Sequence, residues 1–248
     1  MHGKTYQYSA LLFLIYLHVM KTIGLIGGIT WLSTMDYYRL LNQLTNEKLG
    51  GVSSCKLLMN SLEFEEIKAL TFAGDWDSIA AIVCKAAQTL ELAGADCILI
   101  GANTMHHVAD KVQSSINIPL IHIAEVTANV IAEKGLNKVA LLGTRYTMQM
   151  EFYKNKLADK NIETIIPDVE DIEFINHAIY EEMGKGIFTS ETKENFLQII
   201  KGLREKDVQG VILGCTEIPI LIKQQDVSIP VFDTTLIHVQ AAVSFALK

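Results

Sequence analysis

The chain has 248 residues, of which 50% are hydrophobic, 20% charged and 8% aromatic, and its formal net charge is -7. This composition supports a sizeable core and excludes a disordered or fibrous chain, and the length suits one large α/β domain or two small ones. Acidic residues outnumber basic ones by 28 to 21 and no basic block is present, so nucleic acid is not an expected partner. The 4 cysteines form no CxxC pair, which indicates a reducing, cytoplasmic location.

Residues 1–19 form a separate segment, with an apolar stretch from Ala10 to Leu17 behind Lys4. The stretch is shorter than the roughly 20 apolar residues that a membrane-spanning helix needs, and no small-residue cleavage site follows it. We therefore expect no membrane partner. We interpret residues 1–19 as an extension that is not part of the fold, with translation naturally beginning at Met20.

From Met20 onward, short apolar runs alternate with amphipathic stretches. The apolar runs predict strands at residues 22–26, 56–60, 97–100, 120–123, 139–142, 211–213 and 231–232. Helices are predicted between them, for example at residues 33–44, 76–93, 127–134, 148–160 and 193–206. Because the strands are apolar throughout rather than alternating, we expect a mostly parallel sheet that is covered on both faces.

Three strand-and-turn segments occur twice, in the same order and at nearly constant spacing. TIGLIG (22–27) matches KVALLG (138–143), ILIGANT (98–104) matches VILGCT (211–216), and IPL (118–120) matches IPV (229–231). The repeat predicts an α/β fold of two lobes related by a pseudo-twofold axis, each with a mostly parallel sheet flanked by helices. We expect the N-terminal lobe at residues 20–122 together with a C-terminal helix at about 234–248, and the C-terminal lobe at residues 123–233.

Ligands of open α/β sheets bind beyond the carboxyl ends of the strands. The segments that would arrive there are GGIT (27–30), GANT (101–104), GTR (143–145) and GCTE (214–217). A pseudo-twofold axis would bring them together across one cleft, where backbone N–H groups at helix starts suit a small anion such as a carboxylate. The active site is therefore predicted in the cleft between the lobes.

Cys215 is the most nucleophile-like residue, because it follows an apolar strand in a polar loop ahead of a predicted helix start. A helix N-terminus favours a thiolate, so we expect a depressed pKa for this thiol. The alternative interpretation is a buried structural cysteine.

Other polar residues near these loops each have a functional and a structural interpretation. His106 and His107 would either line the cleft or cap a helix, and His122 fits a structural role slightly better than a catalytic one. Glu217 suits a substrate ammonium or the helix dipole, and Arg145 suits a substrate carboxylate or solvent. Adjacent histidines have no recognised metal-site spacing, and no metal site is predicted.

At the level of motifs, the chain resembles the aspartate/glutamate racemase family over essentially all of residues 20–248. The motifs are GLIGGITWLSTMDYYRLLN, GANTMHHVAD, LLGTRYTM-x-x-x-FY, GCTEIPILI and PVFDTTLIH. The first loop resembles that of the broad-specificity aspartate/glutamate branch. The resemblance implies a racemase with no cofactor, neither pyridoxal phosphate nor a metal. It would remove the α-proton of an acidic amino acid on one face and return a proton on the other.

The resemblance also implies site residues. Cys215 would be one catalytic acid/base, and Ala102 stands where the family carries the other, a cysteine or, in the branch named above, a threonine. Substrate contacts would come from Ile29, Ala102, Asn103, Thr104, Thr144, Thr216 and Glu217. Because Ala102 can neither take nor give a proton, a symmetric two-thiol mechanism is excluded. Thr104, a histidine or a bound water would then act on the second face.

Some features leave other functions open. Relatives carry an arginine after the second strand and a lysine in the second lobe, whereas residues 61–67 hold no arginine here and Lys185 is shifted by one position. The alternatives to a racemase are a non-catalytic or one-base binder of small carboxylates and a single-thiol decarboxylase of the same superfamily. A homodimer is an open possibility.

Overall fold

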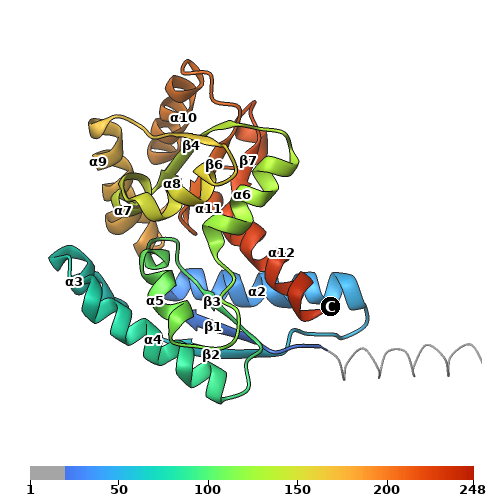
Figure 1. Cartoon of the computed structure of the whole chain (residues 1–248). Coiled ribbons are helices and arrows are strands. Elements are labelled where there is room, and N and C mark those ends of the chain that lie inside the picture. The colour runs from blue at the N-terminus through green and yellow to red at the C-terminus, as the bar shows by residue number, and fades with distance from the viewer. Residues whose placement is uncertain (1–19) are drawn as a thin grey trace, which may run out of the picture.

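Two parallel sheets stand one above the other in the computed structural model, which describes residues 20–248 (Figure 1). The predicted extension, residues 1–19, lies outside the described residues. The sheet of the first lobe has the order β2 (Leu57–Ser61), β1 (Ile23–Gly27), β3 (Cys97–Ile100). The sheet of the second lobe has the order β5 (Glu163–Ile165), β4 (Lys138–Gly143), β6 (Val211–Gly214), β7 (Val231–Asp233).

Both sheets have the same topology. In each, the first strand of the sequence repeat lies between the second and the third, and all pairings are parallel. β7 pairs with β6 in the second lobe, and an isolated bridge between Leu120 and Ile98 occupies the corresponding place in the first. The predicted fold class, two α/β lobes with parallel sheets flanked by helices, is confirmed. The residue boundaries proposed for the two lobes stay a prediction.

Two local predictions were wrong, and one strand was missed. The strand expected at 120–123 is reduced to the bridge at Leu120, because the His122 side chain accepts the Ala124 N–H and starts helix α6 (Ile123–Glu133). The helix expected at 148–160 is two helices, α7 (Arg145–Gln149) and α8 (Glu151–Ala158), separated by Met150 in an extended conformation. The edge strand β5 was missed because its three residues are only partly buried and carry no apolar run.

Side chains of the first sheet alternate between two buried layers, which explains why its strands are apolar at successive positions. One layer packs against α2 (Trp31–Leu49) and the last helix, α12 (Thr234–Ala246); its strand residues are Ile23, Leu25, Cys97 and Leu99. The other layer packs against α3 (Phe64–Ala73), α4 (Trp76–Leu92) and α5 (Ala109–Ser114), and contains Ile26, Ile98 and Ile100.

Helices α6 and α12 are exchanged between the lobes. Each follows the last strand position of its own repeat, yet α6 buries Ile123, Ala128 and Ile131 in the core of the second sheet. Conversely, α12 leaves β7 and runs down beside α2 to cover the first sheet (Figure 1), burying Val239 and Ala242 there. The core of each lobe is therefore completed by a helix that follows the strands of the other lobe: α6 completes the second lobe and α12 the first.

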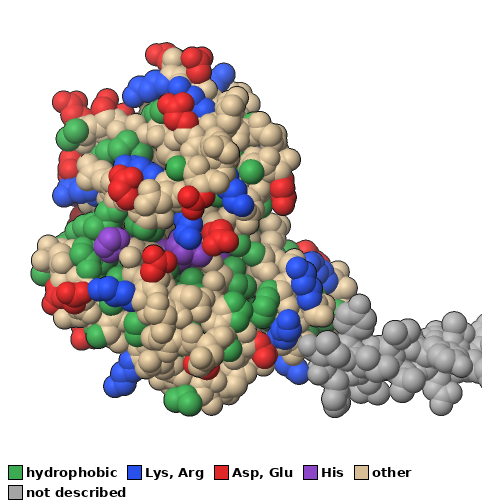
Figure 2. Space-filling view, viewed as in Figure 1, with side chains coloured by type: hydrophobic (Ala, Val, Ile, Leu, Met, Phe, Trp, Pro, Cys, Tyr) green, Lys and Arg blue, Asp and Glu red, His purple; other side chains and the backbone are tan. Residues whose placement is uncertain are grey.

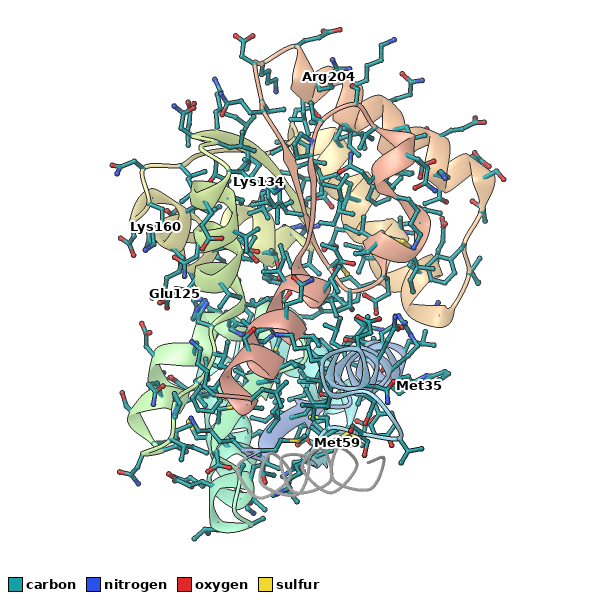
Figure 3. All side chains as sticks on the ribbon, turned by 90° about the vertical axis from the view of Figure 1, so that its right-hand side faces the viewer. Met35, Met59, Glu125, Lys134, Lys160 and Arg204 are labelled. Atoms are coloured by element: carbon teal, nitrogen blue, oxygen red, sulfur yellow. The ribbon has the colours of Figure 1, made fainter. Side chains whose placement is uncertain are left out.

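Short and peripheral helices fill the remaining connections. They are η1 (Thr104–Val108), α9 (Val169–His177), η2 (Ala178–Glu182), η3 (Met183–Lys185), α10 (Ser190–Arg204), α11 (Ile218–Leu221) and η4 (Gln224–Asp226). Met35 on α2 and Met59 on β2 project outward from the first lobe (Figure 3), and about half of each is exposed. Within residues 20–248, no helix combines the length and apolarity that a membrane crossing requires.

Three buried histidines lie where η1, α6 and α12 meet. The ring of His106 lies 4.8 Å from that of His122 and 5.6 Å from that of His238. Tyr37 Oη lies 2.8 Å from His238 Nδ1, and His238 Nε2 lies 2.7 Å from the Ile121 carbonyl oxygen. Burial lowers the pKa of His106 to about 4, of His238 to about 3 and of His122 to about 2. The cluster is therefore neutral near pH 7 and packs as part of the core.

This cluster predicts that the protein loses stability in mild acid. The unfolded chain protonates each histidine below about pH 6.5, whereas the folded chain keeps them neutral, so the free energy of unfolding falls as the pH drops. At about pH 5, each of the fully buried His106 and His238 should cost about 2 kcal/mol. Denaturant titrations between pH 7 and pH 5 measure the effect, and His238→Gln should make the dependence shallower. Equal slopes in His238→Gln and in a control variant of the exposed His177 would contradict this account.

Candidate active site

A cavity of about 210 Å3 lies between the lobes, at the carboxyl ends of both sheets. It occupies the waist that Figure 2 shows between the two halves of the molecule, where histidine and charged side chains gather on the outer surface. Every residue predicted for the site lines this cavity: Ile29, Ala102, Asn103, Thr104, Thr144, Cys215, Thr216 and Glu217. The loops from both halves of the sequence repeat therefore meet, although the roles predicted for these residues stay predictions.

The loop after β1 is shaped by Gly28. Its φ of 83° is in the left-handed region, and a Cβ there would lie 2.1 Å from the Leu62 carbonyl oxygen. The Gly28 N–H donates to Thr34 Oγ1 at 2.7 Å, and the Ser33 N–H donates to Thr30 Oγ1 at 3.2 Å, which caps α2. These contacts direct Thr30 towards the second lobe.

The loop after β6 gathers three donors on one carboxylate. Glu217 is 4% exposed, and its Oε2 accepts from Cys215 Sγ at 2.9 Å and from Thr216 Oγ1 at 2.7 Å. Its Oε1 accepts from Thr30 Oγ1 of the first lobe at 3.0 Å. Glu217 therefore lies against the candidate nucleophile and also bridges the cleft.

The expectation of a depressed pKa for Cys215 was wrong. Burial raises the pKa of the Cys215 thiol well above its usual value, and the charge of the Glu217 carboxylate raises it further. Hydrogen bonds from the backbone N–H groups of Glu217 and Ile218 lower the pKa of the thiol, but by less than burial and Glu217 raise it. The helix that follows, α11, spans only four residues, so its dipole is weak compared with the adjacent carboxylate.

The loop after β3 carries Ala102, which is 8% exposed and lines the cavity. Next to it, Asn103 Nδ2 donates to Thr234 Oγ1 at 3.1 Å, while the buried Asn103 Oδ1 has no hydrogen-bond partner among the residues that the structure describes. Thr104 Oγ1 lies 2.8 Å from Thr144 Oγ1 of the second lobe. Asn103 lines the cavity, and an amide oxygen without a donor would accept from a ligand N–H group that came within reach of it.

Four residues that were weighed for the site do not line the cavity. His106 is buried and its Nδ1 lies 2.9 Å from the Ala102 carbonyl oxygen, and His122 caps α6. The His107 ring packs 4.6 Å from that of Trp76. Arg145 forms an ion pair with Glu173. Because these four side chains do not line the cavity, they cannot contact a ligand bound there, and their contacts are with other parts of the protein.

Sequence reasoning missed several residues of the cavity wall. Thr30 lies within the GGIT segment but was not predicted as a site residue. Lys68 immediately follows residues 61–67, the segment in which relatives carry an arginine. Lys185 was noted only as a shifted residue, and Tyr180 carried no signal because it lies in the irregular turns of η2. Lys68 forms a 3.9 Å ion pair with Glu65, and Lys185 a 2.6 Å ion pair with Glu181.

Among residues 20–248, no group of three or more histidine, cysteine, aspartate or glutamate side chains is arranged to hold a metal ion.

Comparison with known proteins gives consistent matches. The sequence matches the Asp/Glu/hydantoin racemase family over residues 26–242. It is similar to a candidate Asp/Glu racemase from Yersinia pestis, with 46% identity and a TM-score of 0.86 over 92% of this chain and 100% of that chain. An aspartate racemase homologue from Pyrococcus horikoshii OT3 has 39% identity and a TM-score of 0.81, over 92% of this chain and 100% of that chain. The broad-specificity amino-acid racemase RacX of Bacillus subtilis (strain 168) is 23% identical over 177 residues, which are 68% of this chain and 73% of RacX.

The two-lobed fold, the cavity between the lobes and these matches define an isomerase that acts without pyridoxal phosphate. The chain belongs to the Asp/Glu/hydantoin racemase family, which confirms the resemblance inferred from the motifs.

The Gly28 loop generates a testable prediction. Gly28→Ala should lower the free energy of unfolding by more than about 3 kcal/mol. The new methyl group would clash with the Leu62 backbone, and alanine is strained at the positive φ that Gly28 adopts. Gly135→Ala is the matched control: its φ is 70° but a Cβ there meets nothing within 4 Å, so the cost should be about 1 kcal/mol. Denaturant unfolding of both variants checks this. Equal losses would show that the Leu62 contact is unimportant.

Proposed function

We propose that the cavity binds an acidic amino acid, aspartate or glutamate, and racemises it at the α-carbon with Cys215 as one acid/base. The observation that carries the proposal is the placement of the Cys215 thiol in a cavity between duplicated loops, with Ala102 in the matching loop of the other lobe. Membership of a racemase family supports the reaction type.

The polar atoms of the wall suit the α-carbon substituents. Asn103 Oδ1 has no donor among residues 20–248 and would accept from the substrate ammonium. The hydroxyl groups of Thr104, Thr144 and Thr216 would donate to the α-carboxylate, whose charge grows as the α-proton leaves. Ile29 and Ala102 would contact the carbon skeleton.

Two cations at the cavity support a second carboxylate on the substrate. Lys68 and Lys185 line the cavity on different lobes, and each forms one ion pair, with Glu65 and Glu181 respectively. A substrate carboxylate between them would gain two attractive interactions, which would replace the arginine that residues 61–67 lack.

The chemistry is asymmetric because one face of the substrate has no thiol. On the Cys215 face, the thiolate takes the α-proton and the electron pair moves into the carboxylate, which becomes enolate-like. On the Ala102 face, a bound water or Thr104 supplies the proton. Water is a weaker acid than a thiol, so this step should limit the rate.

Proton exchange at the α-carbon tests the assignment. Each enantiomer of aspartate and glutamate is incubated with the protein in deuterated water, and racemisation and label uptake are followed by chiral chromatography and mass spectrometry. Cys215→Ser should reduce exchange by about 100-fold or more, because a hydroxyl is a far weaker base than a thiolate. Full activity in Cys215→Ser would remove the catalytic assignment, and no exchange with any of the four substrates would favour a binder of small carboxylates.

Restoring a second thiol should increase the racemisation rate. Ala102→Cys places a titratable sulfur in the loop that corresponds to that of Cys215, and the expected gain is about 100-fold. Ala102→Ser is the matched control, since it has a similar volume and no comparable acidity, and it should gain little. Equal rates in the two variants would mean that Ala102 does not lie at the missing acid/base position.

The substrate class is tested by removing the cations. Lys68→Met and Lys185→Met should each raise KM for an acidic substrate about fivefold to tenfold while changing kcat less. Lys111→Met is the control, because Lys111 pairs with Asp77 away from the cavity. An unchanged KM in both cavity variants would contradict a second substrate carboxylate.

One observation also favours a second candidate, a single-thiol decarboxylase. Much of the wall is apolar, including Phe64, Ile67, Met105 and Ile179, and a poorly solvated carboxylate loses CO2 more readily. In that reaction the bond from the α-carbon to CO2 breaks, and the carbanion takes its proton from Cys215. Release of CO2 from a substituted malonate, with no exchange from amino acids, would favour this function.

A further inference from the structure

Phe72 is an aromatic side chain in the last turn of α3 that is 55% exposed and does not line the cavity. Its ring nevertheless contacts two side chains that do line it. The Lys68 Nζ atom lies 5.8 Å from the centroid of the Phe72 ring. The centroid of the Tyr180 ring lies 5.2 Å from that of Phe72, at an interplanar angle of 70°. Phe72 therefore connects a cation of the first lobe with the cavity wall of the second.

The contact between Lys68 and Phe72 follows from their spacing on α3. Residues four apart on a helix are neighbours on its surface. The distance of 5.8 Å from ammonium to ring centroid is short enough for a cation–π attraction. The Lys68 side chain is 24% exposed, so most of it is removed from solvent, which strengthens such an attraction. The ring therefore favours the side-chain conformation in which Lys68 lines the cavity.

Glu65 holds Lys68 less firmly. It provides the one ion pair that Lys68 makes among residues 20–248, with 3.9 Å between Lys68 Nζ and Glu65 Oε2. The Glu65 side chain is 77% exposed, and an exposed ion pair of this kind contributes little. Glu65 therefore does not fix the position of the ammonium, and the Phe72 ring is the contact that can.

The last turn of α3 is attached to the second lobe at two adjacent residues. Tyr146 Oη donates to the Thr71 carbonyl oxygen at 3.2 Å, and the Phe72 ring packs against Tyr180. Tyr180 belongs to η2, which is anchored because Ile179 is buried in the core of the second lobe. In Figure 1, α3 lies on the side of the first lobe that faces the second. The orientation of the Phe72 ring is therefore set from the second lobe.

We propose that Phe72 is a positioning residue whose ring holds the Lys68 ammonium at the cavity, where it meets the second carboxylate of an acidic substrate. The inference rests on the proposed function and deepens it, because it names a residue outside the cavity that sets selectivity for that carboxylate. A cation that is already in place loses less conformational entropy when the carboxylate binds. Phe72 should thus favour an acidic amino acid over its amide.

The test compares aspartate with asparagine and glutamate with glutamine, since each amide has nearly the shape of the acid but no second charge. Dissociation constants are measured by titration calorimetry in the full-length protein carrying Cys215→Ser, so that turnover does not interfere. Phe72→Leu keeps an apolar side chain but removes the ring. It should raise the dissociation constant of the acid about threefold to fivefold and that of the amide less than about twofold.

Two further variants separate positioning from a general structural role. Phe72→Tyr keeps the ring and should bind acid and amide within about twofold of the parent protein. Phe245→Leu is the matched control, because Lys21 Nζ lies 4.3 Å from the Phe245 ring and neither residue lines the cavity. It should bind both ligands as the parent protein does. Thermal unfolding of each variant verifies that it is folded.

Two outcomes of these measurements would overturn the proposal. Equal losses for acid and amide in Phe72→Leu would show that Phe72 only supports the structure. The same loss in Phe72→Tyr as in Phe72→Leu would show that the ring is not what matters.

A double-mutant cycle tests whether Phe72 acts through Lys68. In the Lys68→Met protein, Phe72→Leu should change the dissociation constant of the acid by less than about 1.5-fold, because no ammonium remains to be positioned. A threefold loss that persists in the Lys68→Met protein would contradict the proposal.

The same measurements distinguish failure of this proposal from failure of the proposed function. If Lys68→Met weakens the preference for the acid and Phe72→Leu leaves it unchanged, the site for a second carboxylate stands and the role of Phe72 is rejected. If the parent protein binds the amide as tightly as the acid, the second carboxylate is rejected, and the role of Phe72 with it. Racemisation itself is measured separately, by the proton exchange described above.

Discussion

The site depends on one constraint, which is that the parallel strands of both sheets end at the same cleft. Every strand that precedes a site loop points its carboxyl end there, and the loops then bond to one another across it. Thr30 donates to Glu217, and Thr104 contacts Thr144. These contacts are between short side chains, so small movements of one lobe against the other would break them. The position of the lobes and the state of the site are therefore linked.

Duplication has supplied two similar frameworks with different chemistry. The first copy presents Ala102 and a hydrogen-bonding network of Asn103 and Thr104, whereas the second presents a thiol and a carboxylate in contact. The loop that carries Ala102 has no titratable side chain next to the cavity, but it places Asn103 and Thr104 there. In the second copy, burial and the Glu217 carboxylate both raise the pKa of Cys215, which favours the neutral thiol. The side chains at the cavity therefore differ between the two lobes, although the strands that carry them are arranged alike.

The sequence predicts the fold well where the signal is local. The apolar strands and their repeat predicted both sheets, because such runs form only when both faces are covered. It also predicted the loops that line the cavity. It failed where a distant contact decides the outcome. The state of Cys215 depends on a carboxylate two residues away whose orientation is set by Thr30 from the other lobe. Lys68 and Tyr180 come from elements with no repeat signal, and they reach the cavity only through the packing of α3 and η2.

The exchange of α6 and α12 has a consequence for how this fold can be divided. A fragment cut at the midpoint of the repeat would hold a complete set of strands but would carry a helix that belongs on the absent sheet. Part of one apolar face of each isolated sheet would then be exposed to solvent. Two such fragments should associate and restore the fold when they are co-expressed, whereas each fragment alone should aggregate. Evolution by joining two ancestral copies would thus have made their mutual dependence difficult to reverse.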